Sequence, residues 1–100
     1  MEKYKVMLTR RAVRDLDDIF SYIAYEKQSP ENAKGQTDRI RHALQSLDTF
    51  PQSHQERQVG RYANQGYRQL LTDDYIAIYR INEEQRIVLV LTIQYQGRDL

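Results

Sequence analysis

Three short apolar segments follow one another near the end of the chain, separated only by small polar breaks. They span residues 67–71, 75–81 and 87–95. Each segment is rich in β-branched and aromatic residues, and the breaks hold Asp, Asn or Glu, which is typical of a β-meander. Every position from residue 87 to residue 91 is apolar. We therefore expect the last strand to lie centrally in the sheet, covered on both faces.

A helical pattern precedes the meander, from residue 10 to about residue 27. Its apolar side chains recur in steps of three and four residues, which builds one apolar stripe along a helix. These side chains are Val13, Leu16, Ile19, Phe20, Ile23 and Ala24. Thr9 is placed to cap the amino end of this helix. Asp15, Asp17 and Asp18 lie early in the segment and Lys27 lies late, an order that the helix macrodipole favours.

A break and a second helical pattern come next. Ser29 can cap the new helix, Pro30 fits its first position, and Glu31 lies in its first turn. Apolar or small residues again recur in steps of three and four, and the pattern ends near residue 48. They are Ala33, Thr37, Ile40, Leu44 and Leu47. Two helices joined by so short a turn should lie antiparallel as a hairpin.

The order of the elements predicts the fold class. Residues 3–8 alternate weakly and are expected to form a first strand. The order is then β-α-α-β-β-β, an α+β fold in which the helical hairpin packs on an antiparallel sheet. One hundred residues with 40% apolar content make one domain, 1–100. Residues 52–65 are polar and are expected to form a loop, with a strand turn at 58–62 as an alternative. Loops of this length often carry a site.

Composition excludes several classes of site. The chain has no Cys, which rules out disulfides and thiolate metal sites, and His42 and His54 have no ligand-like spacing. We therefore expect no metal and no cofactor. No apolar stretch reaches 18 residues, so the default expectation is a soluble cytoplasmic protein without membrane contact. A net charge of +1 gives no general electrostatic argument for nucleic acid.

The basic residues of the second half are all arginines. They are Arg57, Arg61, Arg68, Arg80, Arg86 and Arg98. Arginine binds phosphate and carboxylate groups bidentately, whereas lysine acts as a point charge, so this set suits recognition of oxyanions or of an acidic partner. A solvated face is the equally weighted alternative.

The order and spacing of these elements resemble the RelE/ParE superfamily of bacterial toxins across nearly the whole chain. The residues that carry the resemblance are Ala12, Asp15, Leu16, Ile19, Tyr22, Ile23, Pro30, Ala33, Leu47, Phe50, Pro51, Gly66, Tyr67, Arg68, Leu70, the strand 75–80 and the ending Gly97-Arg98-Asp99-Leu100. The string from Asp15 to Ile23 and the Arg-Asp-Leu ending are closer to ParE. Two features depart from the family pattern, the absence of a glycine shortly after Pro51 and the presence of Gln96 where a histidine is common.

The resemblance implies a small cytoplasmic toxin of a type II toxin-antitoxin system, held inactive by a cognate antitoxin. Within this family the target is either DNA gyrase, which ParE toxins poison, or mRNA on the ribosome, which RelE toxins cleave without metal. We expect ParE-like growth inhibition through gyrase. The alternatives are a ribosome-dependent mRNA endonuclease and an inactive relative that serves as a binding module.

Four residues are the candidates for a catalytic site if the chain cuts RNA. Arg68 and Arg80 resemble arginines that ribonuclease members use against phosphate, Tyr95 ends the last strand, and Glu56 lies where some relatives carry a carboxylate, close to His54. An odd-numbered loop between the second and third strands would place both arginines on one face, and a two-residue loop would place them on opposite faces. We expect them to converge.

Overall fold

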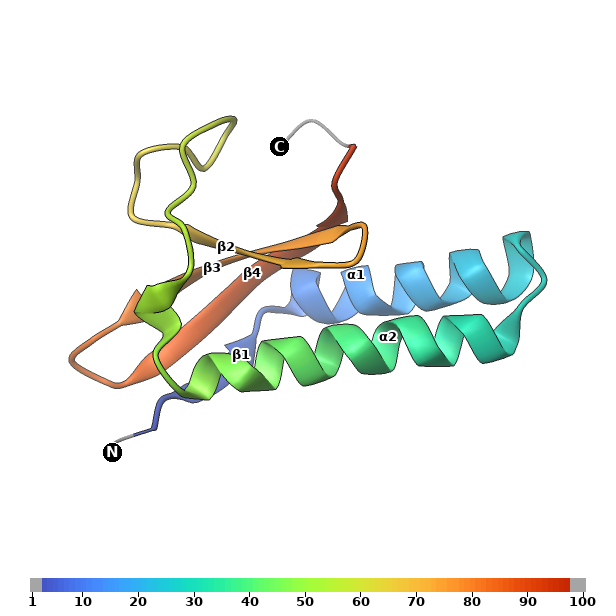
Figure 1. Ribbon diagram of the computed structural model, residues 1–100, viewed down its shortest axis with the longest axis horizontal. Coiled ribbons are helices and arrows are strands. Elements are labelled where there is room, and N and C mark those ends of the chain that lie inside the picture. The colour runs from blue at the N-terminus through green and yellow to red at the C-terminus, as the bar shows by residue number, and fades with distance from the viewer. Residues whose placement is uncertain (1–2, 98–100) are drawn as a thin grey trace.

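A four-stranded sheet carries a helical hairpin on one face, and the hairpin runs past one end of the sheet (Figure 1). The computed structural model describes residues 3–97. The elements are β1 (Lys5–Leu8), α1 (Arg10–Ser21), the π-helix η1 (Tyr22–Glu26), α2 (Pro30–Gln45), the 3-10 helices η2 (Ser46–Asp48) and η3 (Pro51–Ser53), β2 (Arg68–Thr72), β3 (Tyr75–Asn82) and β4 (Ile87–Tyr95). The predicted α+β order β-α-α-β-β-β is confirmed.

The strands lie in the order β1-β4-β3-β2, so the central position predicted for β4 is confirmed. The meander strands β2, β3 and β4 pair antiparallel, whereas β1 pairs parallel to β4. The sheet is therefore mixed and not antiparallel throughout as expected. Alternation of side chains along β1 is the same in either direction, so the sequence pattern carries no information on this point.

The core lies between the hairpin and one face of the sheet. Helix residues such as Leu16, Ile40 and Leu44 pack there against Tyr79 and Val90 of the two middle strands. Burial of these side chains supplies most of the driving force for folding. No helix in the described part of the chain is both long and apolar enough to span a bilayer.

Thr9 caps α1 as predicted, because its hydroxyl accepts a hydrogen bond from the Ala12 amide at 3.1 Å. The expected charge order is wrong. The first turn contains no acidic residue and begins with Arg10 and Arg11, and the last turn contains no basic residue. The α-helix ends at Ser21 and gives way to the π-helix, so the aspartates of α1 do not lie at its amino end.

Pro30 starts α2 and Glu31 lies in its first turn, both as expected. Ser29 occupies the cap position, but its side chain makes no capping hydrogen bond. The helix is tied to the sheet at the β2–β3 turn, where the Arg39 Nε donates to the Asp73 carboxylate at 2.9 Å. This pairing lowers the pKa of the Asp73 carboxyl.

The connection between α2 and β2 holds the 3-10 helices η2 and η3 and an isolated bridge. The strand turn expected at residues 58–62 is absent, and Glu56 instead pairs antiparallel with Arg68 at the outer edge of β2. Backbone hydrogen bonds flank this pair, from the Arg57 amide to the Tyr67 carbonyl at 2.7 Å and from the Gln69 amide to the Gln55 carbonyl at 3.0 Å. The connection therefore adds a short edge beside the sheet.

A β-bulge in β4 joins the sheet to α1. Ile78 pairs with Thr92 and Tyr79 with Val90, so Leu91 is the extra residue. The Asp15 carboxylate accepts hydrogen bonds from the Thr92 hydroxyl at 2.7 Å and from the Ile93 amide at 2.9 Å.

Thr9 contacts the same bulge from the first turn of α1. Its hydroxyl donates to the Leu91 carbonyl at 2.8 Å, and its amide donates to the Val90 carbonyl at 3.0 Å. The Leu91 carbonyl and the Ile93 amide are thus hydrogen-bonded by α1 and its cap, whereas the bond from the Thr9 amide extends the parallel β1–β4 ladder.

We predict that Asp15→Ala lowers the free energy of unfolding by about 2 to 3 kcal/mol, because a partly buried amide and hydroxyl lose a charged acceptor. Urea unfolding followed by circular dichroism measures the change. Asp18→Ala removes an exposed carboxylate from the same helix and should change stability by less than about 0.5 kcal/mol. Equal losses in the two variants would contradict the role assigned to Asp15.

Candidate functional site

The four candidate catalytic residues do not converge on one place. The β2–β3 turn contains only residues 73 and 74, so Arg68 pairs with Tyr79 and not with Arg80. Arg68 therefore shares the helix-bearing face with Tyr79, whereas the exposed Arg80 points to the opposite face. The expected convergence of the two arginines is wrong, because the turn has two residues and not three.

A row of polar side chains crosses the β2 edge of the sheet on the helix-bearing face. Glu56 lies directly opposite Arg68, and Arg68 lies directly opposite Tyr79. The Glu56–Arg68 pair is of the type without hydrogen bonds between its own backbones, which brings the two side chains close together. The Arg68 Nη1 donates to the His54 carbonyl at 2.7 Å, so the guanidinium is partly engaged by the backbone.

Tyr79 is the fully buried end of this row. Its hydroxyl donates to the Pro51 carbonyl at 2.6 Å, and the His54 ring meets its ring edge-on with centroids 6.4 Å apart. Pro51 follows Phe50, whose φ of 51° is in the left-handed region that bulky residues rarely adopt. Burial raises the pKa of Tyr79 to about 12, although the charge of Arg68 acts to lower it. This phenol is therefore a structural donor and not a base at neutral pH.

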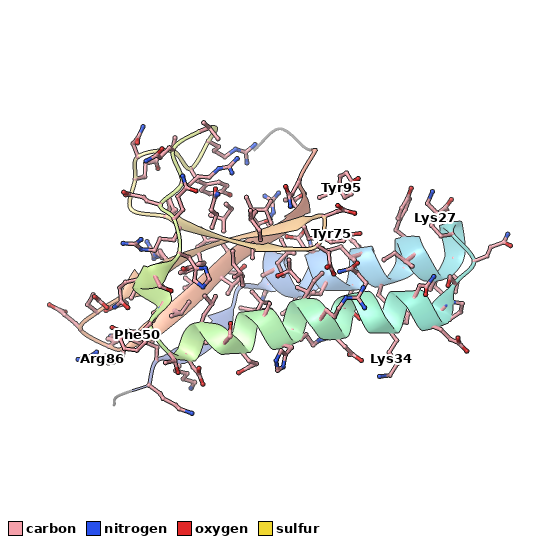
Figure 2. The ribbon with its side chains drawn as sticks, viewed as in Figure 1. Lys27, Lys34, Phe50, Tyr75, Arg86 and Tyr95 are labelled. Carbon is pink, nitrogen blue, oxygen red and sulfur yellow. The ribbon has the colours of Figure 1, made fainter. Side chains whose placement is uncertain are left out.

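Tyr95 lies at the other end of the sheet. It pairs with Tyr75, and their rings meet edge-on at 5.7 Å between centroids. Tyr75 is four residues from Tyr79 along β3, which is about 13 Å at the rise of an extended strand. Figure 2 shows Tyr75 and Tyr95 on the side of Lys27 and the helical tip, away from Phe50 and Arg86. Tyr95 is thus separated from Arg68.

A second polar network lies beside the first and was not anticipated from the sequence. Tyr4 donates through its hydroxyl to the Glu83 carboxylate at 2.7 Å and accepts from the Gln52 amide at 2.7 Å and from the Arg86 guanidinium at 3.2 Å. The Gln52 amide also donates to the Glu83 carboxylate, at 3.1 Å. The hydrogen bonds from Tyr4 and Gln52 lower the pKa of the Glu83 carboxyl, and the charges of Arg86 and Arg68 act in the same direction. The residues come from three separate segments, before β1, in η3 and in the β3–β4 turn, and share no motif, so the sequence held no signal for this network.

The β2 edge presents two half-buried arginines, Arg57 and Arg68, and the exposed Glu56, whose backbone pairs with that of Arg68. Such a set can bind an anionic or polar group of a partner. Among residues 3–97, no group of three or more His, Asp or Glu side chains is arranged to hold a metal ion.

Comparison with known proteins finds relatives that match nearly the whole chain. A family model described as the ParE toxin of the type II toxin-antitoxin system parDE matches residues 6–100. A relative from Sinorhizobium fredii (strain NBRC 101917 / NGR234), named "Putative toxin Y4kP", is 32% identical over 98 residues, which cover 96% of this chain and 95% of the relative.

Solved structures show the same architecture. The chromosomal ParDE toxin-antitoxin system of P. aeruginosa contains a chain that aligns with a TM-score of 0.75 at 22% identity, over 93% of this chain and 96% of that chain. The RelBE2 toxin-antitoxin complex of Mycobacterium tuberculosis aligns with a TM-score of 0.64 at 22% identity, over 98% and 97% of the two chains. At these identities the likeness establishes the fold.

We predict that the stability advantage of the wild-type chain over Tyr79→Phe disappears at alkaline pH. The pKa of Tyr79 is about 12 in the folded chain, above the value of about 10 for an unfolded tyrosine. Its contribution is therefore fully present below pH 10 and is lost as the pH rises from about 10 to about 12, by about 2 kcal/mol.

Urea unfolding of both proteins between pH 7 and pH 12 measures this difference. The remaining seven tyrosines are shared by the two chains, so their titration cancels in the comparison. A difference that stays constant across the range would show that Tyr79 does not titrate on unfolding.

Proposed function

The chain belongs to the ParE toxin family of type II toxin-antitoxin systems, and on this premise we propose that it inhibits cell growth by binding and poisoning DNA gyrase. The dispersion of the candidate catalytic residues carries this proposal. Metal-free cleavage of RNA needs a base, a cation and an acid around one phosphate. Arg68 and Arg80 lie on opposite faces, and Tyr95 lies at the far end of the sheet. This dispersion favours a toxin that acts by binding.

We also propose a small antitoxin as the resident partner. The structures of similar fold from P. aeruginosa and M. tuberculosis come from a ParDE toxin-antitoxin system and a RelBE2 toxin-antitoxin complex. In the described chain β1 is an edge strand and pairs only with β4, and its Met7 side chain is exposed. An extended antitoxin segment can add to such an edge, or an amphipathic helix can pack between hairpin and sheet. Either mode would account for the inhibition of the toxin.

A ribosome-dependent mRNA endonuclease is the second candidate, and the Glu56–Arg68 pair favours it. Glu56 and Arg68 occupy directly opposed positions on one face, from which a carboxylate and a guanidinium can both reach a bound phosphate. In this reading Arg68 and Glu56 would do the chemistry together, without Arg80, which lies on the opposite face of the sheet, or Tyr95, which lies at its far end.

We predict that the purified chain inhibits supercoiling by bacterial gyrase and leaves ready-made mRNA intact in a cell-free translation reaction. Both assays use the same protein over the same concentration range, and the cleaved gyrase–DNA complex is trapped with detergent and counted. Message cut within codons, with supercoiling unaffected, would reverse the assignment in favour of the endonuclease.

Single substitutions separate the two readings further. We expect Arg68→Ala and Arg80→Ala to leave the mRNA intact, as the wild-type chain does, and to keep the fold by circular dichroism. If the wild-type chain cuts mRNA, Arg68→Ala should lower the cutting rate by about 100-fold or more, because a cation at the developing phosphate charge is lost. Arg80→Ala, on the other face, is then the matched control.

A further inference from the structure

The exposed side of α1 carries its charges in an order that the isolated helix disfavours. Arg10 and Arg11 occupy the first turn and Arg14 follows, whereas Asp17 and Asp18 lie in the second half. Cations near a helix amino end oppose the macrodipole, and Arg10 and Arg14 are like charges one turn apart. This arrangement destabilises the helix in a single copy of the chain.

These charges are not compensated by ion pairs within residues 3–97. The ion pairs seen among the described residues lie elsewhere, and α2 shows the contrast. There Asp38 pairs with Lys34 at 2.7 Å and with Arg41 at 3.7 Å. On α1, Arg14 has Asp17 and Asp18 three and four residues away, yet it pairs with neither. The charges of α1 thus remain available to a partner.

Four of the exposed residues form one stripe along the helix. Arg10, Val13, Arg14 and Asp17 are spaced at i, i+3, i+4 and i+7, so they share a face. Val13 is 49% exposed near the middle of the stripe. The stripe therefore has a positive end, an apolar centre and a negative end, with about 10 Å between the α-carbons of Arg10 and Asp17 at the rise of an α-helix.

We propose that this stripe is a self-association surface, on which α1 packs antiparallel against α1 of a second copy of the chain around a two-fold axis. In this arrangement Arg10 of each copy faces Asp17 of the other, and Val13 packs on the alkyl part of Arg14 of the other. Each ion pair occurs twice by symmetry. The inference does not depend on whether gyrase or mRNA is the target.

Charge complementarity favours a second copy over an acidic or a basic partner. An acidic segment would match Arg10 and Arg14 but would repel Asp17, and a basic segment would do the reverse. The antiparallel second copy matches both ends with the same surface. Exposed ion pairs contribute little each and are screened by salt, so the dimer is weak and forms at high protein concentration and low ionic strength.

The test is sedimentation equilibrium of the purified full chain at 50 mM salt, from micromolar to about millimolar concentration. We expect a reversible dimer. Arg10→Asp should raise its dissociation constant about tenfold or more, since two attractive pairs become repulsive, and Asp17→Arg should do the same. The double variant R10D/D17R restores opposite charges across the axis and should return the dissociation constant to within about threefold of wild type.

Two controls make the result decisive. Arg10→Asp places an acid in the first turn of α1, so the melting temperature should rise while the dimer weakens, which excludes misfolding as the cause. Lys34→Asp reverses an exposed charge on α2 and should leave the dimer unchanged. A wild-type chain that stays monomeric throughout, or a double variant as weak as the singles, overturns the proposal. Loss of antitoxin binding on Arg10→Asp without any wild-type dimer also overturns it and assigns the stripe to the antitoxin.

Discussion

The contact between α1 and the bulge of β4 determines how the two layers of the molecule meet. Thr9, the cap of α1, donates to the Leu91 carbonyl, and Asp15, six residues later, accepts from the Thr92 hydroxyl and the Ile93 amide. Two such points set both the position and the rotation of α1. The π-helix and a short turn connect α1 to α2, so the same contact orients the whole hairpin. Since β4 is a central strand, the contact also fixes the position of the hairpin relative to the sheet.

The elements that were predictable from sequence are those with a strong period or a specific end signal. The apolar stripes predicted both helices, and Thr9 predicted the start of the first. The continuous apolar run of β4 predicted its central position in the sheet. The parallel direction of β1 and the bulge at Leu91 were not predictable, because both depend on pairing with a distant segment and leave no local pattern. The π-helix at Tyr22–Glu26 continues the apolar period of α1, so the sequence pattern does not distinguish it from further α-helical turns.

The candidate site was harder to predict from the sequence. One residue more or less in the β2–β3 turn decides whether Arg68 and Arg80 lie on the same face of the sheet. A turn of two residues instead of three moves Arg80 to the other face from Arg68. The sequence Thr72-Asp73-Asp74 allows both lengths, since Asp73 adopts a positive φ of 53° that aspartate tolerates. The contact of Asp73 with Arg39 on α2 accompanies the shorter turn, and such a long-range interaction cannot be seen in the local residues.

The parallel pairing of β1 with β4 has a consequence for the newly made chain. Thr9 and Leu91 hydrogen bond across 82 positions, and the apolar faces of both helices have no central strand to cover until β4 has been synthesised. Contacts of such long sequence separation form late and slow the folding of small domains. A ribosome that is still translating β4 therefore carries a chain with exposed apolar helices and an incomplete sheet, so this domain completes its fold only after β4 has left the ribosome.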